Sequence, residues 1–474
     1  MSKTKEYAKN TFILFLGKFS TQFISFLLLP IYTYFLATSD YGMVDIIQTY
    51  ISLLIPILTL RLDSAAFRFL VDVRNSRDDE KKIIISNILS ILVILTLFFI
   101  FFTFILSHFL EIKYYYLILC NVPAIMLSNV LLQLVRGLGD NKKYSIACAL
   151  TGVFTLFLNC LLIIFMNLGA SSILIASTIA NLICTIYLIK SCNILKLISF
   201  DKINRTAINE YLKYSLPMIP NSLSWWIVNV SDRSIITFFI GVSANGIYSV
   251  SSKFSNILNS IFSIFNLSWQ EAVSVNINSD DCNQFFSKII NEILNLFMIL
   301  STVIIAVLPL CYSIIIGKNY QKAYIYIPIL LVANIFNILI NLLGGVYIAQ
   351  KNTKKLAVTT AVSAITNILI NILFVRKYGL FAASFSTLIA YFATLVWRYF
   401  DIKKIIKITL DRKRISFNFL LLTMSIVLYY IDNIIIAFIW VIICCVTFLV
   451  GNLEIIKKIM QLLYLKFGGK NETI

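Results

Sequence analysis

Residues 83–107 read IIISNILSILVILTLFFIFFTFILS and contain no charged side chain. A helix needs about 20 consecutive, mainly apolar residues to cross the hydrocarbon core of a bilayer. This stretch is long enough and apolar enough to meet that requirement. We therefore expect residues 83–107 to form a transmembrane helix.

The composition of the whole chain agrees with this local pattern. Of 474 residues, 59% are hydrophobic and 13% are charged, and the mean hydropathy is +0.88. A soluble protein has about 25% charged residues. A soluble core cannot bury this much apolar surface, because surface grows quickly relative to volume. Lipid must cover much of it.

Similar apolar runs recur along the chain between charged or Gly- and Asn-containing breaks. The first run begins after the charged segment MSKTKEYAKN and continues to about Leu36 without a small-residue cleavage site, so we expect it to be retained as a span. The fold class is therefore an all-α integral membrane protein with about fourteen transmembrane helices. The expected spans are 10–36, 41–70, 83–107, 115–138, 144–167, 172–190, 212–238, 246–272, 287–315, 323–349, 356–375, 380–400, 416–430 and 433–453.

The distribution of Lys and Arg sets the orientation. With the N-terminus inside, the cytoplasmic segments hold 29 of these residues and the outside loops hold 5. Positive residues collect on the cytoplasmic side of membrane proteins, so we expect both termini in the cytoplasm. The net charge of +18 is then an orientation signal, and it requires no nucleic-acid partner.

Two chemical classes of site are disfavoured by residue usage. The nine cysteines include no CxxC pair and mostly lie in apolar runs, as small buried hydrophobes do. The single histidine, His108, stands near a helix end beside Glu111. We expect no disulfide framework, no metal site and no bound cofactor. The Walker-type phosphate loop that would indicate ATP hydrolysis does not occur either.

An internal repeat divides the chain into two halves. FLATSDYGMVDIIQTY (35–50) aligns with FIGVSANGIYSVSSKF (239–254), and 141–177 follows the same plan as 352–390. The offset covers six helices, an even number, so the halves share one orientation. Such repeats are typical of transporters with a site between the lobes. We expect two six-helix lobes around a central cavity. The predicted domains are 1–192, an inter-lobe linker 193–213, 214–400, and 401–474 with a basic linker and two extra helices.

Polar side chains follow one face of several expected spans. On an ideal helix the polar residues of 246–272 fall within an arc of about 140°, and the spans 10–36 and 212–238 have polar faces too. These residues either line a cavity or pack helix on helix. The candidate cavity-lining residues are Gln22, Ser25, Asn229, Ser252, Asn256, Ser260 and Ser263.

Four cations lie deep within expected spans, and each costs about 2.5–3.5 kcal/mol at the bilayer centre. They are Lys18, Arg61, Arg233 and Lys253. We expect them to face water, an anion or a carboxylate. If they face one cavity, they form a stepped cationic path for an anionic group, whereas structural ion pairing is the alternative. The candidates for coupling to H⁺ or Na⁺ are Asp45, Asp63 and Asp232.

Three segments resemble the polysaccharide-flippase (Wzx-type, O-antigen) family of the multidrug/oligosaccharidyl-lipid/polysaccharide exporter superfamily. They are KNTFILFLGKFSTQFISFLLLPIYTYFLATSDYGMVDII, TLRLDSAAFRFL, and IAQKNTKKLAVTTAVSAITNILINILFVRKYGLFAAS. The resemblance covers nearly the whole chain. Arg68 resembles the arginine in the family's ending of the second span, while Arg61 stands where many relatives carry a small residue.

The resemblance implies a lipid-linked oligosaccharide flippase that works by alternating access and is not an enzyme. Its substrate would be an undecaprenyl-diphosphate-linked glycan unit, of O-antigen or a related surface polysaccharide such as lipopolysaccharide, moved to the outer leaflet. The resemblance implies a bacterial cytoplasmic (inner) membrane, with membrane lipids, a polysaccharide polymerase and chain-length machinery as partners. Cavity cations would meet the diphosphate, which suits Lys18, Arg233 and Lys253.

Other functions stay open from the sequence. A flippase for the peptidoglycan lipid precursor would share the same lobes and extra helices. A drug/cation antiporter would use buried carboxylates, but a cation-lined cavity repels a cationic drug. A membrane enzyme is disfavoured because the longest loop, 190–213, is cytoplasmic and has no carboxylate cluster. A non-transporting scaffold would leave the intramembrane cations without a purpose.

Overall fold

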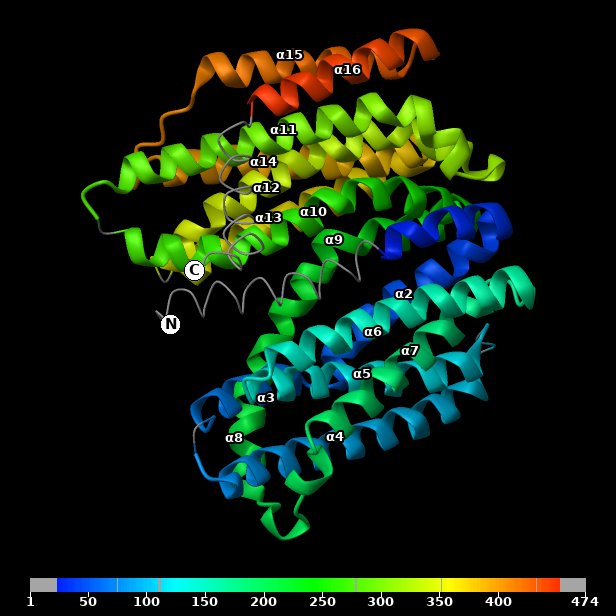
Figure 1. Cartoon of the computed structure of the whole chain (residues 1–474), viewed down its shortest axis with the longest axis vertical. Coiled ribbons are helices and arrows are strands. Elements are labelled where there is room, and N and C mark those ends of the chain that lie inside the picture. Colours follow the sequence, from blue (N-terminus) through cyan, green and yellow to red (C-terminus); the bar gives the residue numbers. More distant parts are fainter. Residues whose placement is uncertain are drawn as a thin grey trace, which may run out of the picture. The chain divides into compact units, whose positions relative to one another are not determined.

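The computed structural model describes residues 24–451, apart from 75, 110, 112, 278, 351 and 432. Within this part of the chain every regular element is a helix (Figure 1). Nine of these helices are long and apolar enough to cross a membrane. The all-α membrane fold expected from the sequence is confirmed. Most of the first expected span, 10–36, falls outside the described residues.

The described chain forms two compact units. Of the described residues, unit 1 contains those of 24–253, 318–320 and 367–383, and unit 2 contains the rest. The helices that belong wholly to unit 1 are α2 (Thr38–Leu58), α3 (Leu62–Asp72), α4 (Asp78–Ser107), α5 (Tyr115–Gly137), α6 (Asn141–Cys160), α7 (Ser171–Ser191), α8 (Arg205–Ser215) and α9 (Ile219–Phe239). Helix α10 (Val242–Asn276) begins in unit 1 and continues into unit 2.

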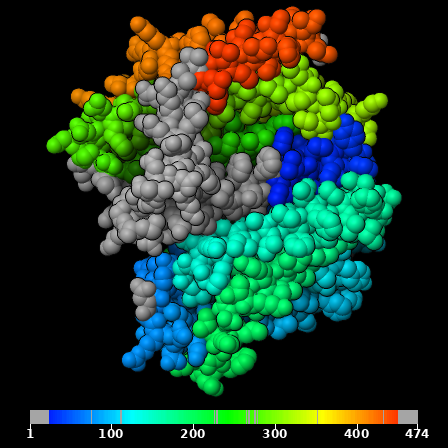
Figure 2. Space-filling view, viewed as in Figure 1, coloured from blue at the N-terminus to red at the C-terminus, as the bar shows by residue number. Residues whose placement is uncertain are grey.

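Unit 1 is built around α4, α5, α6 and α7, which pack side by side (Figure 1). Helix α4 carries the stretch that opened the sequence argument, and its middle exposes large apolar side chains. Ile94 is 65% exposed and Phe101 is 62% exposed. Helix α6, teal on the visible face in Figure 2, likewise exposes Val153 and Phe157. Apolar surface of this extent suits lipid contact.

The second expected span, 41–70, is two helices and not one. Helix α2 ends at Leu58, and Leu60 and Arg61 then adopt the left-handed backbone conformation, with φ of 48° and 57°. Pro56 weakens the last turn of α2, because proline has no N–H to donate. The chain therefore breaks a few residues after Pro56.

Helix α8 shows that the expected linker 193–213 is not simply a connection. Arg205–Ser215 form a helix against α3 and α4. The Asn204 side chain caps this helix by accepting from the Thr206 N–H at 2.9 Å. The rings of Tyr211 and Phe69 meet edge to face, 4.8 Å apart. The segment therefore docks onto the first unit as a short amphipathic helix.

Unit 2 contains the second part of α10 and the helices that follow it. They are α11 (Cys282–Ile315), α12 (Ile327–Ala349), α13 (Thr353–Tyr378), α14 (Leu380–Ile402), α15 (Arg412–Tyr429) and α16 (Ile434–Gly451), although α13 ends and α14 begins in unit 1. Helices α15 and α16 pack on α11 (Figure 1). Their bounds lie close to the two extra spans expected at 416–430 and 433–453.

One cation near the end of the expected span 380–400 is buried. Arg398 of α14 is 2% exposed. Its guanidinium donates to the Ile340 carbonyl at 2.9 Å and to the Thr360 hydroxyl at 2.9 Å. Nε donates to the Thr359 hydroxyl at 3.0 Å. Carbonyl and hydroxyl oxygens thus satisfy this charge within unit 2, and Arg398 contributes to the packing of α12, α13 and α14.

Candidate functional site

A close helix crossing in unit 1 brings the candidate residues of α2 and α10 together. Gly42 and Gly246 lie at this crossing. A Cβ atom on Gly42 would come 2.1 Å from the Val242 carbonyl oxygen, and one on Gly246 would come 2.2 Å from the Thr38 carbonyl oxygen. Two backbones approach this closely only where side chains are missing. The residues one turn farther along each helix are therefore in direct contact.

Asp45, one turn after Gly42, is the centre of a buried polar cluster. Its carboxylate is 5% exposed and accepts three kinds of donor. Oδ1 accepts from the Ser249 hydroxyl at 2.7 Å and from Arg233 at 3.1 Å. Oδ2 accepts from the Asn245 amide at 3.2 Å. We call Asp45, Arg233, Asn245, Ser249 and Lys253 the Asp45 cluster. Both carboxylate oxygens of Asp45 thus have hydrogen-bond donors away from bulk water.

Arg233 of α9 is the cationic partner in this cluster, and its ion pair is not with the adjacent Asp232. Nη1 also donates to the Thr49 hydroxyl at 3.4 Å, and Nη2 donates to the Ser252 hydroxyl at 3.3 Å. The side chain of Arg233 retains 17% exposure. Arg233 thus joins α2, α9 and α10, and its pairing with a carboxylate corresponds to the structural alternative left open by the sequence.

Lys253, unlike Arg233, forms no ion pair within the Asp45 cluster. It lies one turn after Ser249 on α10, close enough to interact electrostatically with both Asp45 and Arg233. Among the described residues, no carboxylate oxygen lies within 4.0 Å of its ammonium group. The Asp45 cluster therefore contains two cations and one carboxylate. Basic side chains therefore outnumber carboxylates in this cluster, in a helix bundle where an unbalanced charge is costly.

Asp232 belongs to a second polar group in unit 1. Its carboxylate is 7% exposed and accepts from the Tyr248 hydroxyl at 3.0 Å and from the Asn371 amide at 2.9 Å. Asn371 comes from α13, which is 139 residues away in the chain. Asp232 and Arg233 therefore point to different neighbours, as adjacent residues on a helix must.

Arg61 and Asp63 meet each other at the break between α2 and α3. Arg61 lies 3.6 Å from the Asp63 carboxylate and donates to the Ser64 hydroxyl at 2.6 Å. Their side chains are 27% and 20% exposed. Arg68, farther along α3, pairs with Asp72 on the same helix. These are local contacts, and none of them involves the Asp45 cluster.

The remaining predicted site residues lie on the first described helix, on later turns of α10, or outside the described residues. Lys18 and Gln22 lie outside the described residues, as does the side chain of Asn229. Ser25 is half-buried in the first described helix. On α10, the Ser260 hydroxyl donates to the Asn256 carbonyl at 2.9 Å and the Ser263 hydroxyl to the Ser260 carbonyl at 2.8 Å. The hydroxyls of Ser260 and Ser263 are thus satisfied by their own helix.

Sequence reasoning missed Asn245 and did not single out Ser249 on the polar face of 246–272. The internal repeat carried a signal for Ser249. When Gly42 is aligned with Gly246, Asp45 falls opposite Ser249 and Thr49 opposite Lys253. Equivalent positions of a repeat can meet when the repeats pack about a local twofold axis. The aligned pair Asp45 and Ser249 does meet, through a hydrogen bond.

The polar cluster sits in the part of the chain that matches a known family. A family model described as "Polysaccharide biosynthesis protein" matches residues 7–270, more than half of the chain. The chain belongs to this family. No curated protein sequence matches the chain.

Solved membrane transporters share the fold of this family member at low sequence identity. "Lipid II flippase MurJ, inward closed conformation" has a TM-score of 0.67 and 17% identity, over 95% of this chain and all of that one. An inward-facing multidrug resistance MATE family transporter of the MOP superfamily has a TM-score of 0.66 and 13% identity, over 81% of this chain and 95% of that one. The MATE multidrug transporter DinF-BH has a TM-score of 0.60 and 15% identity, over 88% of this chain and 97% of that one. At these identities the likeness establishes the fold: a multi-pass transporter fold of the MOP type.

Proposed function

We propose that this protein moves undecaprenyl-diphosphate-linked glycan repeat units from the cytoplasmic to the outer leaflet of the bacterial cytoplasmic membrane. The glycan is that of O-antigen or a related surface polysaccharide. The protein acts as a transporter and not as an enzyme. Family membership over residues 7–270 supports a role in surface polysaccharide synthesis, and the MurJ and MATE-like fold supports transport.

The observation that carries the substrate class is the charge imbalance of the Asp45 cluster. Asp45 neutralises one of two cations, which leaves the charge of Lys253 without an ion-pair partner among the described residues. A phosphate group supplies negative charge and several acceptor oxygens for an ammonium group. A lipid diphosphate therefore complements this cluster, whereas a cationic compound meets repulsion.

Arg233 and Asp45 fit a role in the transport cycle. A coupling cation bound at Asp45 would compete with Arg233 for the carboxylate and free the guanidinium for a phosphate. Proton or sodium coupling through Asp45 is therefore part of the proposal. Lys18 is proposed as a further cation on the path. The local pair of Arg61 with Asp63 favours a structural role for both residues at the helix break.

A second candidate is a flippase for the peptidoglycan lipid precursor. The structural likeness to a lipid II flippase extends over 95% of this chain, and a lipid diphosphate is common to both proposed substrates. The Asp45 cluster would bind the diphosphate, which both proposed substrates contain. It therefore does not distinguish an O-antigen-type glycan from the glycan of the peptidoglycan precursor. A drug/cation antiporter is the weaker alternative, since the cluster has surplus positive charge.

The proposal includes a cellular context. Both termini lie in the cytoplasm, in line with the distribution of Lys and Arg. A lipid-linked unit delivered to the outer leaflet must next be polymerised, so a polysaccharide polymerase with its chain-length machinery is the expected consumer of the product. Membrane lipids surround the exposed apolar faces of α4 and α6.

A translocation assay in proteoliposomes tests the proposal. Purified protein is reconstituted with a fluorescent undecaprenyl-diphosphate oligosaccharide, and a membrane-impermeant quencher reports how much lipid changes leaflet with time. Loss of one charge-assisted hydrogen bond lowers binding affinity by about 10- to 100-fold. We expect Lys253→Gln to slow translocation by about this factor and Lys253→Arg to restore part of the rate.

The matched control is Lys322→Gln, which removes the same charge from an exposed position in the segment before α12. We expect it to leave the translocation rate unchanged. Translocation rates are also compared for several glycans on the same lipid. A faster rate for an O-antigen-type unit or for the peptidoglycan precursor distinguishes the two proposed substrates. An undiminished rate in Lys253→Gln, or equally fast transport of a cationic dye, would contradict the proposed substrate class.

A further inference from the structure

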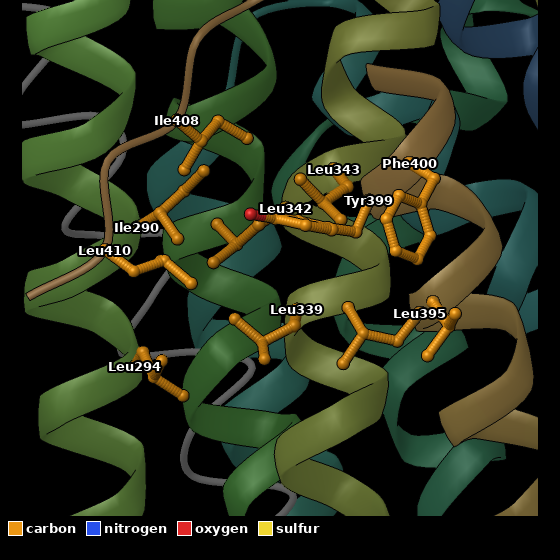
Figure 3. A pocket seen from close by; sticks show the side chains of 11 residues that line it. Ile290, Leu294, Leu339, Leu342, Leu343, Leu395, Tyr399, Phe400, Ile408 and Leu410 are labelled. Carbon is orange, nitrogen blue, oxygen red and sulfur yellow. The ribbon is translucent and has the colours of Figure 1, made fainter. Parts of the chain in front are cut away.

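Unit 2 contains an apolar pocket that the proposed transport role does not use. Its volume is about 400 Å³. Figure 3 shows side chains of α11, α12 and α14 converging on it, together with Ile408 and Leu410 from the segment after α14. The lining residues are Ile290, Leu294, Leu339, Leu342, Leu343, Leu395, Val396, Tyr399, Phe400, Ile408 and Leu410. Tyr399 supplies the only polar side-chain atom among them.

The segment 407–411 is fixed against α11 and forms one wall of the pocket. Its alternate N–H groups donate to α11 side chains: Lys407 to Asn283 at 2.8 Å, Thr409 to Ser287 at 2.9 Å and Asp411 to Asn291 at 3.0 Å. The Asn291 amide donates back to the Thr409 carbonyl at 2.9 Å. These bonds account for three donors of a segment that has no regular secondary structure before Arg412.

The spacing of these bonds explains why the segment fits. Two residues of extended chain advance about 6.6 Å, and four residues of α-helix advance about 6 Å. Side chains at every fourth position of α11 therefore meet every second N–H of the segment. The intervening residues, Ile408 and Leu410, line the pocket. One wall of the pocket is thus held in place by hydrogen bonds between the 407–411 segment and α11.

The pocket opens to the surface through apolar residues. Phe400 is 60% exposed, Leu410 is 38% exposed and Val396 is 37% exposed. In a helical membrane protein, apolar residues exposed on the outside of a bundle contact lipid. The natural neighbour of this opening is a hydrocarbon chain.

Three basic residues lie in the segment that joins two pocket-lining residues, Phe400 and Ile408. Lys403, Lys404 and Lys407 are all exposed, and the nearby Asp401 is paired with Lys355. Basic groups at the membrane surface attract anionic headgroups. Figure 3 shows the Tyr399 ring extending toward the middle of the pocket. Its hydroxyl is suited to donate to an ester carbonyl at the glycerol level of a lipid, as interfacial tyrosines do.

We propose that this pocket binds one acyl chain of an anionic phospholipid, whose headgroup phosphate lies against Lys403, Lys404 and Lys407. The pocket holds the hydrocarbon, Tyr399 meets the ester group, and the three lysines select for negative charge. The occupant is a bilayer phospholipid and not the lipid-linked substrate, because a polyprenyl chain carries no ester carbonyl for Tyr399. A bound phospholipid would also complete the packing between the 407–411 segment and α14.

Native mass spectrometry of the full-length protein, purified in mild detergent and titrated with defined lipids, tests this inference. The probes are phosphatidylglycerol, phosphatidylethanolamine and undecaprenyl phosphate. We expect phosphatidylglycerol to be retained in preference to phosphatidylethanolamine. The triple variant Lys403→Gln/Lys404→Gln/Lys407→Gln should weaken phosphatidylglycerol binding by at least about fivefold. Val396→Trp, which narrows the opening, is expected to reduce binding of all phospholipids.

The matched control is the triple variant Lys142→Gln/Lys190→Gln/Lys196→Gln, which removes three exposed cations of unit 1. It should leave binding unchanged. Tyr399→Phe should weaken phosphatidylglycerol binding without changing its preference over phosphatidylethanolamine. The inference is overturned if the two triple variants lose lipid equally, if Val396→Trp retains full binding while still folded, or if undecaprenyl phosphate displaces phosphatidylglycerol.

Discussion

Gly42 of α2 and Gly246 of α10 oppose each other with reciprocal contacts. The position of a Cβ on Gly42 is blocked by the Val242 carbonyl, and that on Gly246 by the Thr38 carbonyl. Thr38 and Val242 occupy equivalent places in the internal repeat, as do the two glycines. The two helix segments therefore cross about a local twofold axis within unit 1. This crossing places the next turns of α2 and α10, and with them Asp45 and Ser249, in contact.

Enlarging Gly246 is expected to destabilise the protein in proportion to the size of the new side chain. Gly246→Ala should cost about 1–3 kcal/mol, because the added carbon overlaps backbone atoms that cannot move separately. Gly246→Leu should cost more. Thermal unfolding of the purified protein in detergent measures both.

Gly169 is the control for this series. Its φ is 62°, and nothing lies within 4 Å of an added Cβ. Gly169→Ala should cost about 1–2 kcal/mol for the left-handed backbone alone, and Gly169→Leu little beyond that. A Gly246→Ala variant as stable as the wild type would show that the crossing is not tight.

The pair of Asp45 and Arg233 is expected to show strong energetic coupling. Removing one partner leaves the other charge buried, which costs about 3–5 kcal/mol. Asp45→Asn and Arg233→Gln should each lower the unfolding temperature, whereas the double variant should lose less than the sum of the two. A double-mutant cycle on thermal stability measures the coupling. Additive effects would mean that the ion pair does not persist in the folded protein.

Arg398 is expected to be needed for stability. Arg398→Leu removes the donors to Thr359, Thr360 and the Ile340 carbonyl. Each bond to a charged group is worth about 1.5–3 kcal/mol, so we expect a loss of at least about 3 kcal/mol. Arg398→Lys should rescue little, because an ammonium group cannot reproduce the planar fork. The control Arg412→Leu changes an exposed arginine and should stay within about 0.5 kcal/mol of wild type.

The 407–411 segment is expected to loosen when Asn291 is changed. Asn291→Ala removes the acceptor for the Asp411 N–H and the donor to the Thr409 carbonyl. Loss of about 1 kcal/mol of local protection should speed amide exchange at Asp411 about fivefold. Hydrogen–deuterium exchange measures this. Ser301→Ala is the control, since the Ser301 hydroxyl donates to the Phe297 carbonyl of its own helix. Unchanged exchange in Asn291→Ala would show that the segment is held by other contacts.

Part of the candidate site could be predicted from the sequence. The polar face of 246–272 led to Ser252 and Lys253, and the cost of intramembrane charge led to Arg233. The partner of Arg233 could not be found this way, because Asp45 lies 188 residues earlier in the chain. Helix periodicity is a local property, and it contains no information about which distant face will pack against it.

The all-helical membrane fold was determined by the sequence alone, although the expected span 41–70 is two helices. Each span satisfies its own backbone hydrogen bonds and is selected by the hydropathy of about 20 neighbouring residues, so the necessary information is local. Which group each buried charged side chain contacts was decided only by the tertiary structure. Asp45 meets Arg233, and Arg398 is buried among carbonyls and hydroxyls, because helix packing brings together groups that no spacing along the chain relates.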